Sequence, residues 1–321
     1  MRIAFFGTPD FAAEQLEYLI KQGVEIVAIV TAPDKPAGRG KILSQSSVKA
    51  VALKYMIPVF QPTNLKDPSF INDLKSLCAD LFVVIAFRML PEVIWNLPPL
   101  GTFNLHASLL PQYRGAAPIN RAIINGESRT GLTTFFINET IDTGHILKQV
   151  EIEIGANETA GELHDRMIEE GKKLIINTLQ DIEHGRSTVL AQASVITDST
   201  LLKTAPKLYK EDGKIIWGKE GNEIHNQIRG LSPHPGAFTQ LIDNEGNTLD
   251  IKIYRSEFES KFHDEAQFTL MTDNRTYLKV ALRDGYLHLN QLQQAGKKTL
   301  FQKEFLNGFK FSGKWSVNLA Y

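Results

Sequence analysis

The stretch from Phe103 to Pro118 reads Phe-Asn-Leu-His-Ala-Ser-Leu-Leu-Pro-Gln-Tyr-Arg-Gly-Ala-Ala-Pro and indicates where a strand of the fold ends. Asn104 and His106 are two residues apart in an extended pattern, so both side chains should leave the same face of a strand. The strand cannot continue through the breakers that follow, Pro111, Gly115 and Pro118. Because open α/β sheets bind ligands at the carboxyl ends of their strands, we expect the chemistry of this protein here.

The amino-terminal part predicts a parallel sheet. An apolar run at residues 2–6, a helical pattern at 11–22 and a second apolar run at 24–31 form a strand-helix-strand unit. The continuous apolar run Leu81–Ala86 is typical of a central parallel strand covered on both faces. The turn Gly7-Thr8-Pro9-Asp10 lacks the further glycines of a dinucleotide site and the Lys-Ser/Thr pair of a phosphate loop, which excludes both. The expected fold is therefore α/β and Rossmann-like.

The pattern changes toward the carboxyl terminus. Residues 189–206 are irregular and rich in Ser and Thr, which is typical of a linker. Short apolar segments separated by turns follow and predict a small OB-like β-barrel. The predicted strands are 214–217, 237–242, 248–254, 267–271, 277–281 and 286–293, with a helix at 220–230. We therefore expect a catalytic domain over 1–188, a linker over 189–206 and a barrel domain over 207–321.

Composition sets broad limits. The chain has 321 residues, 43% of them hydrophobic, which favours two domains because single cores rarely grow beyond roughly 250–300 residues. The net charge of -1 does not by itself indicate a nucleic-acid partner. Cys78, the only cysteine, cannot form an internal disulfide. The sequence shows no signal-peptide pattern and no apolar run of membrane-spanning length, so we expect a cytoplasmic protein without a membrane association.

A long polar insertion at residues 32–47 carries Lys35, Arg39 and Lys41 between glycines and prolines. Structureless insertions of this length are usually functional or disordered. A basic arm of this kind could contact phosphates, whose attraction for Lys and Arg does not depend on base sequence. A solvated loop without a partner is an equally good interpretation from the residues alone.

The polar residues at this strand end suit a reaction in which an oxygen atom gains negative charge and a proton moves. Asn104 can donate hydrogen bonds to the oxygen that becomes negative, and His106 can exchange a proton near neutral pH. Asp142 lies in the turn Thr140-Ile-Asp-Thr-Gly144. A plainer interpretation stays open, because a lone strand histidine is often structural and a turn aspartate often caps its turn. The histidines do not cluster as metal ligands, so we expect no metal, and Ser108 lies in no nucleophile elbow.

Four segments resemble the folate-dependent formyltransferase family: Asn104–His106, Ser108–Pro111, Tyr113–Ile119 and Ile141–Gly144. The unbroken Arg-Gly-Ala-Ala-Pro-Ile run is most similar to the members that formylate methionyl-tRNA. The resemblance also covers Phe6–Phe11, Pro36–Lys41, Gln61-Pro62 and Arg229–Gly236, and so extends over nearly the whole chain.

The resemblance implies a function and three sets of site residues. The substrates would be 10-formyltetrahydrofolate and methionyl-initiator-tRNA, and the product would be the formylmethionyl-tRNA used in translation initiation. It implies a monomer in which Asp142 lies beside the imidazole of His106. The implied sets are a catalytic trio of Asn104, His106 and Asp142, a folate-contacting turn of Ser108, Leu109, Leu110 and Pro111, and a tRNA-binding loop with Lys35, Arg39 and Lys41.

One departure and two alternatives accompany this prediction. The chain has Phe87-Arg88 where relatives commonly carry Tyr-Gly, which removes a hydroxyl and adds a bulky cation near the expected folate pocket. The acceptor could instead be a small amine, such as an amino-sugar nucleotide or glycinamide ribotide. A non-enzymatic RNA-binding protein is the alternative from another class. Replacement of His106 would leave that role intact.

Overall fold

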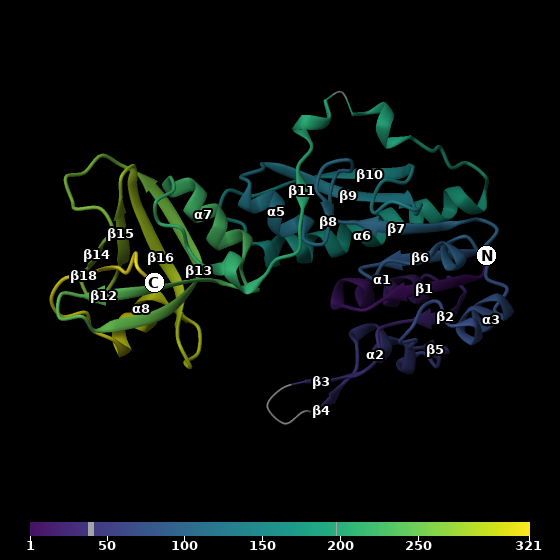
Figure 1. Cartoon of the computed structure of the whole chain (residues 1–321), viewed down its shortest axis with the longest axis horizontal. Helices are drawn as coiled ribbons and strands as arrows, with labels where there is room; N and C mark the ends of the chain where they lie inside the picture. Colours follow the sequence, from purple (N-terminus) through teal and green to yellow (C-terminus); the bar gives the residue numbers. More distant parts are fainter. Residues whose placement is uncertain (38–41, 197) are drawn as a thin grey trace. The chain divides into compact units, whose positions relative to one another are not determined.

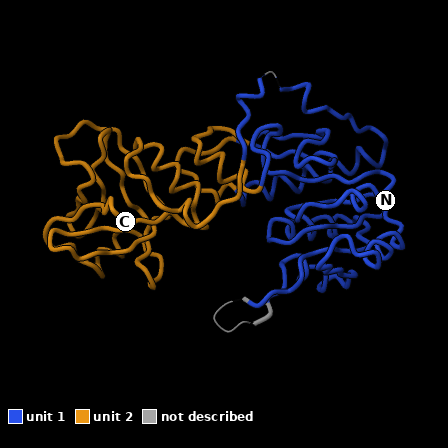
Figure 2. Tube along the Cα trace, in the orientation of Figure 1, with its two compact units in different colours: residues 1–115, 131–152, 164–204 blue, residues 116–130, 153–163, 205–321 orange. Residues whose placement is uncertain are grey.

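The computed structural model describes residues 1–37, 42–196 and 198–321, and it comprises two compact units (Figures 1 and 2). Unit 1 contains residues 1–115, 131–152 and 164–204, and unit 2 contains residues 116–130, 153–163 and 205–321. Within these described ranges, no helix combines the length and the hydropathy that a membrane crossing requires.

Unit 1 is built on a sheet of seven strands in the order β10-β9-β7-β6-β1-β2-β5. The strands β1, β2, β5, β6 and β7 are parallel, and β9 runs antiparallel to β7. This confirms the predicted Rossmann-like sheet. The bounds are β1 (Ile3–Gly7), β2 (Ile26–Val30), β5 (Val59–Phe60), β6 (Leu81–Ile85), β7 (Thr102–His106), β9 (Arg129–Phe136) and β10 (Ile146–Glu153).

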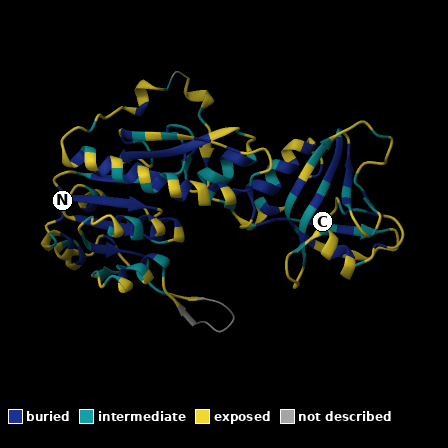
Figure 3. Cartoon of the chain, turned by 180° about the vertical axis from the view of Figure 1, so that it is seen from behind, coloured by how far each residue is buried: buried dark blue, intermediate teal, exposed yellow. Residues whose placement is uncertain are grey.

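The centre of this sheet is apolar on both faces, as the continuous runs in the sequence predict. Every residue of β1 and β6 is buried (Figure 3). On one face, Phe6 and Phe82 pack in a cluster with side chains of α3 and α4. The helix α1 contacts α6 through Gln15, whose Nε2 donates to the Ile168 carbonyl oxygen at 2.9 Å. The helices are α1 (Asp10–Lys21), α2 (Ser47–Lys54), α3 (Pro68–Ser76), α4 (Glu92–Trp95) and α6 (Ala160–Glu183).

The polar insertion is more regular than the sequence predicts. Its two ends form the antiparallel strands β3 (Lys35–Ala37) and β4 (Ile42–Ser44), so the expectation of a structureless segment is wrong there. Strands are predicted from apolar periodicity, so a polar sequence gave no signal for this pairing. Lys35 is exposed on β3. Arg39 and Lys41 lie outside the described residues.

Unit 2 contains a closed antiparallel barrel, which confirms the expected barrel. Its sheet has the order β13-β12-β18-β14-β15-β16-β17, and the additional pairing of β13 with β16 closes the ring. The register of β13 shifts between Ile253 and Ser256, and such an irregularity lets a long strand bend to meet both neighbours. The bounds are β12 (Ala237–Asp243), β13 (Thr248–Ser260), β14 (Thr269–Thr272), β15 (Leu278–Leu282), β16 (Gly285–Gln294), β17 (Leu300–Phe301) and β18 (Trp315–Val317).

One predicted strand of unit 2 is wrong. Residues 214–217 form a single bridge between Lys214 and Phe238 and no strand. The alternation there arises because Ile215 and Trp217 are buried in the barrel core from a loop. The sequence analysis also missed β17, β18 and the last helix. The remaining elements are β8 (Arg114–Gly115), α5 (Pro118–Ile124), β11 (Thr204–Ala205), α7 (Gly221–Gly230), α8 (Gln302–Gly308) and the 3-10 helices η1 (Gln192–Ser194), η2 (Ser199–Leu201) and η3 (Lys210–Gly213).

Gly131 offers a test of how closely β9 and β10 approach each other. A Cβ at this position would lie 2.1 Å from the Val150 carbonyl oxygen and 2.5 Å from Leu109 Cδ2. We expect Gly131→Ala to lower the free energy of unfolding by about 1–3 kcal/mol, because this space cannot accept a methyl group without a backbone shift. Urea denaturation followed by circular dichroism measures the change. Gly218→Ala is the control, since no heavy atom lies within 4 Å of its Cβ position, and equal losses in both variants would contradict the prediction.

Candidate active site

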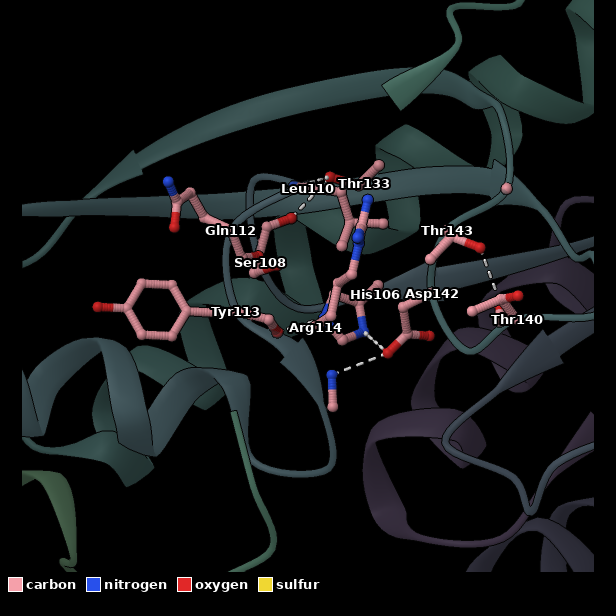
Figure 4. A network of polar contacts seen from close by, with 12 residues as sticks. His106, Ser108, Leu110, Gln112, Tyr113, Arg114, Thr133, Thr140, Asp142 and Thr143 are labelled. Carbon is pink, nitrogen blue, oxygen red and sulfur yellow. Dashed lines mark hydrogen bonds and ion pairs between the residues drawn. The ribbon is translucent and has the colours of Figure 1, made fainter. Parts of the chain in front are cut away.

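His106 is the last residue of β7 and is 6% exposed. Its Nε2 lies 2.9 Å from the Tyr113 carbonyl oxygen. A carbonyl oxygen only accepts, so this contact places a proton on Nε2. The other ring nitrogen, Nδ1, lies 3.8 Å from Asp142 Oδ2 (Figure 4). The neutral imidazole therefore has its lone pair on Nδ1, beside a carboxylate.

Asp142 lies between β9 and β10 and has a φ of 55°. Aspartate is one of the few residues that adopt this left-handed conformation readily. Its Oδ2 accepts a hydrogen bond from the Gly115 backbone N–H at 2.9 Å. Gly144 lets the segment approach β9, because a Cβ there would lie 1.6 Å from the Phe136 carbonyl oxygen. The backbone thus presents the carboxylate to the end of β7.

Gln192 contacts the backbone around Asp142. Its Nε2 donates to the carbonyl oxygens of Asp142 at 2.9 Å and Gly144 at 2.8 Å. Its Oε1 accepts from Arg114 Nε at 3.1 Å and from Nη2 at 2.6 Å. Burial lowers the pKa of Arg114, and the nearby charge of Asp142 opposes that shift. The sequence analysis missed Gln192, because nothing in the irregular segment around it indicates a buried amide.

Asn104 lies two residues before His106 on β7, so its side chain leaves the same face of the strand. Its amide oxygen is buried and has no hydrogen-bond partner among the residues that the structure describes. Buried amides are nearly always paired, so this group is available to a ligand. Within the predicted trio, His106 and Asp142 are in direct contact. Asn104 is related to His106 by its position two residues earlier on the same strand.

The turn at residues 108–111 is held by side chains from the neighbouring strands. Thr133 Oγ1 on β9 donates to the Ser108 carbonyl oxygen at 2.6 Å and accepts from the Leu110 N–H at 3.1 Å. Gln149 Nε2 on β10 donates to the Leu110 carbonyl oxygen at 2.8 Å and to Thr133 Oγ1 at 2.9 Å. Neither Thr133 nor Gln149 is among the predicted site residues. The one available signal was a polar residue within each of these two strands.

The four predicted turn residues differ in what they can offer a ligand. The Ser108 hydroxyl is buried and donates to the Gln112 carbonyl oxygen at 2.6 Å, so it stabilises the turn itself. Leu110 is buried in a cluster with Phe135 and Ile146. Leu109 and Pro111 are partly exposed and provide the accessible apolar surface of the turn.

Of the three residues predicted for the tRNA-binding loop, Lys35 alone lies in the described part of the chain. Lys35 is an exposed cation on β3, and its predicted neighbours Arg39 and Lys41 are not described. In the part of the chain that the structure describes, no three His, Cys, Asp or Glu side chains are grouped closely enough to hold a metal ion.

Thr133 allows a test of how the turn is stabilised. Thr133→Val keeps the side-chain shape but leaves the Ser108 carbonyl and the Leu110 N–H without their partner. We expect the free energy of unfolding in urea to fall by about 1–3 kcal/mol, the usual cost of unpaired buried groups. Thr130→Val on the same strand is the control, because the buried Thr130 hydroxyl has no partner in the described part of the chain and its removal should cost nothing. A loss of equal size at Thr130 would contradict this account.

Comparisons with known proteins find relatives over nearly the whole chain. Residues 1–179 match the formyl transferase family and residues 207–310 match the formyl transferase C-terminal domain. The methionyl-tRNA formyltransferase of Flavobacterium johnsoniae is 49% identical over 99% of this chain and 99% of its own length. That of Parabacteroides distasonis is 45% identical over 99% of this chain and 98% of its own length.

Solved structures share the fold. WlaRD, a sugar 3N-formyl transferase solved with dTDP and 5-N-formyl-THF, covers 93% of this chain and 99% of its own, with a TM-score of 0.65 and 22% identity. The N-formyltransferase of Helicobacter canadensis, solved with folinic acid and dTDP-3-aminofucose, covers 91% and 98%, with a TM-score of 0.63 and 22% identity. Together with the near full-length identity to the curated relatives, these findings place the chain in the methionyl-tRNA formyltransferase family.

Proposed function

We propose that Asn104, His106 and Asp142 catalyse the reaction of this enzyme, the transfer of a formyl group to the amino group of methionyl-tRNA. One observation carries this assignment. An imidazole nitrogen and a carboxylate lie 3.8 Å apart at the end of β7, and Asn104 precedes the histidine by two residues on the same strand.

Asn104 has the chemistry to stabilise the transition state. When the amine attacks the formyl carbon, the carbonyl oxygen gains negative charge, and a fixed donor aimed at that oxygen lowers the barrier. The Asn104 amide nitrogen is such a donor. We assign it the role of holding the developing oxyanion.

His106 has the chemistry to move the proton. Its Nδ1 takes the proton that the attacking nitrogen must lose, and Asp142 stabilises the resulting imidazolium through its charge. The imidazolium then gives this proton to the departing nitrogen. One bond forms between the methionyl nitrogen and the formyl carbon, one bond breaks between that carbon and the donor nitrogen, and one proton moves between the two nitrogens.

The formyl donor we propose is 10-formyltetrahydrofolate. Two proteins that share this fold were solved with formylated folates, which supports a folate as the donor. The turn Ser108–Pro111 is the candidate contact for it. Ser108 and Leu110 fix the shape of the turn from inside, and Leu109 and Pro111 provide apolar surface of the kind that a flat ring system covers.

The acceptor we propose is initiator methionyl-tRNA, bound by a monomer with the division of domains that the sequence suggests. Residues 1–188 would form the catalytic domain, residues 189–206 the connection and residues 207–321 a tRNA-binding domain. The separate family matches at 1–179 and 207–310 support this division. A small closed barrel is also a common fold for binding oligonucleotides.

The proposed reaction predicts how variants of His106 and Asn104 behave. With labelled 10-formyltetrahydrofolate and charged initiator tRNA, we expect the label to reach the methionine nitrogen. His106→Ala should lower kcat roughly 10²- to 10⁴-fold, and Asn104→Ala roughly 10²- to 10³-fold, the usual cost of an oxyanion donor. His184→Ala is the control, since His184 is an exposed residue just beyond α6. Full activity of His106→Ala, or formylation of a small amine in place of the tRNA, would contradict the proposal.

The basic loop should act on tRNA binding and not on chemistry. We expect the triple replacement of Lys35, Arg39 and Lys41 by Ala to raise the KM for tRNA and to reduce its dependence on salt, because fewer counterions are released on binding. The KM for the folate should stay constant. Replacement of three exposed lysines elsewhere in unit 1, Lys66, Lys75 and Lys173, is the matched control. If both triple variants change the KM for tRNA equally, the loop has no special role.

A further inference from the structure

We propose that Gln192 is a positioning residue, which holds Asp142 in the orientation that the imidazole of His106 requires. The proposal rests on the catalytic role of Asp142 proposed above. Gln192 lies in η1, in the irregular segment between α6 and β11. It touches none of the reacting groups itself.

The contacts of Gln192 converge on the two segments that fix the catalytic carboxylate. Its Nε2 donates to the carbonyl oxygens of Asp142 and Gly144, so it fixes the backbone of the turn. Its Oε1 accepts from Arg114, the residue before Gly115. The Gly115 N–H in turn donates to Asp142 Oδ2. One amide therefore connects both the backbone and the side chain of Asp142.

The backbone of Asp142 needs such support. Its φ of 55° lies in the left-handed region, which aspartate adopts more readily than most residues but at a higher energy than the ordinary conformations, so contacts around it stabilise this one. The direction of the carboxylate follows from that conformation. Without the two hydrogen bonds from Gln192, the turn would gain other conformations in which Oδ2 no longer faces His106 Nδ1.

The surroundings of Gln192 indicate that its burial serves this contact. Gln192 is 3% exposed, whereas Ala191, Ala193 and Ser194 on either side are exposed. The segment is attached just before it, where the Leu190 N–H donates to the Ile146 carbonyl oxygen at 2.9 Å and the Ile146 N–H donates back at 2.8 Å. This backbone pairing directs a single side chain of η1 inward, to the turn that carries Asp142.

Gln192→Met tests the role, because Met has a similar size but cannot form the hydrogen bonds. We expect kcat for formyl transfer to fall about 10- to 100-fold, since a misplacement of about 1 Å in a catalytic group can cost 10²-fold. The KM values for the folate and for tRNA should stay within about twofold. Ser194→Ala is the matched control, because the exposed Ser194 hydroxyl of the same 3-10 helix contacts only the Ala191 carbonyl oxygen. An unchanged kcat in Gln192→Met would overturn the proposal.

A double-mutant cycle separates positioning from general stabilisation. If Gln192 acts through Asp142, then Gln192→Met should lower kcat in the wild-type background and have little further effect in an Asp142→Asn background. A purely structural role predicts the same relative loss in both backgrounds, which would overturn the proposal. Urea denaturation of all four proteins shows that they are folded under the assay conditions.

Gln192→Glu adds a second readout. The glutamate side chain keeps the size and can still accept from Arg114, but it has no donor for the carbonyl oxygens of Asp142 and Gly144. We expect it to lose activity like Gln192→Met, and wild-type activity would overturn the assignment of these two bonds. Failure of the proposed function looks different, because Asp142→Asn would then be fully active or the wild-type chain would transfer no formyl group.

Discussion

The hydrogen bond between His106 Nε2 and the Tyr113 carbonyl oxygen decides what the site can do. It fixes the ring proton on one nitrogen and leaves the other nitrogen toward Asp142, 3.8 Å away. If the ring were free to rotate, either nitrogen could meet the carboxylate, and proton transfer would have no defined direction. Tyr113 has a positive φ of 59°, so the turn after β7 bends back and brings its carbonyl to the histidine. The same turn continues into Gly115, whose N–H holds the carboxylate.

The sheet brings together groups that are far apart in the sequence. β7 is parallel to β6 on one side and antiparallel to β9 on the other. Because β9 runs in the opposite direction, Thr133 pairs with His106 near the end of β7, and the segment with Asp142 follows β9. Gln149 on β10 then completes the support of the turn at Ser108–Pro111. The pairing is parallel between β6 and β7 and antiparallel between β7 and β9. Side chains of β9 and β10 can therefore stabilise the turn that follows β7.

The sequence predicts the parts of this site that depend on local patterns. The apolar run of β6 and the alternation of Asn104 and His106 predict a sheet with two polar side chains at a strand end, and the structure has both. It could not predict Gln192 or Gln149, because each acts by a long-range hydrogen bond to backbone. A neutral amide carries no sequence signal for such a contact. Lys214–Trp217 was misjudged for the opposite reason, since buried loop residues reproduce the alternation of a strand.

The groups that donate hydrogen bonds to Asp142 are neutral, and this has an electrostatic consequence. An opposite charge stabilises an imidazolium only to the extent that no other cation neutralises it. Arg114 lies near Asp142, and the charge of Asp142 raises the pKa of Arg114 against the effect of burial. The Arg114 guanidinium nevertheless donates two hydrogen bonds to Gln192 Oε1. A bidentate Arg114–Asp142 pair would direct both carboxylate oxygens away from His106. The amide of Gln192 therefore binds the Arg114 guanidinium near the turn that carries Asp142. The Asp142 carboxylate stays available to His106.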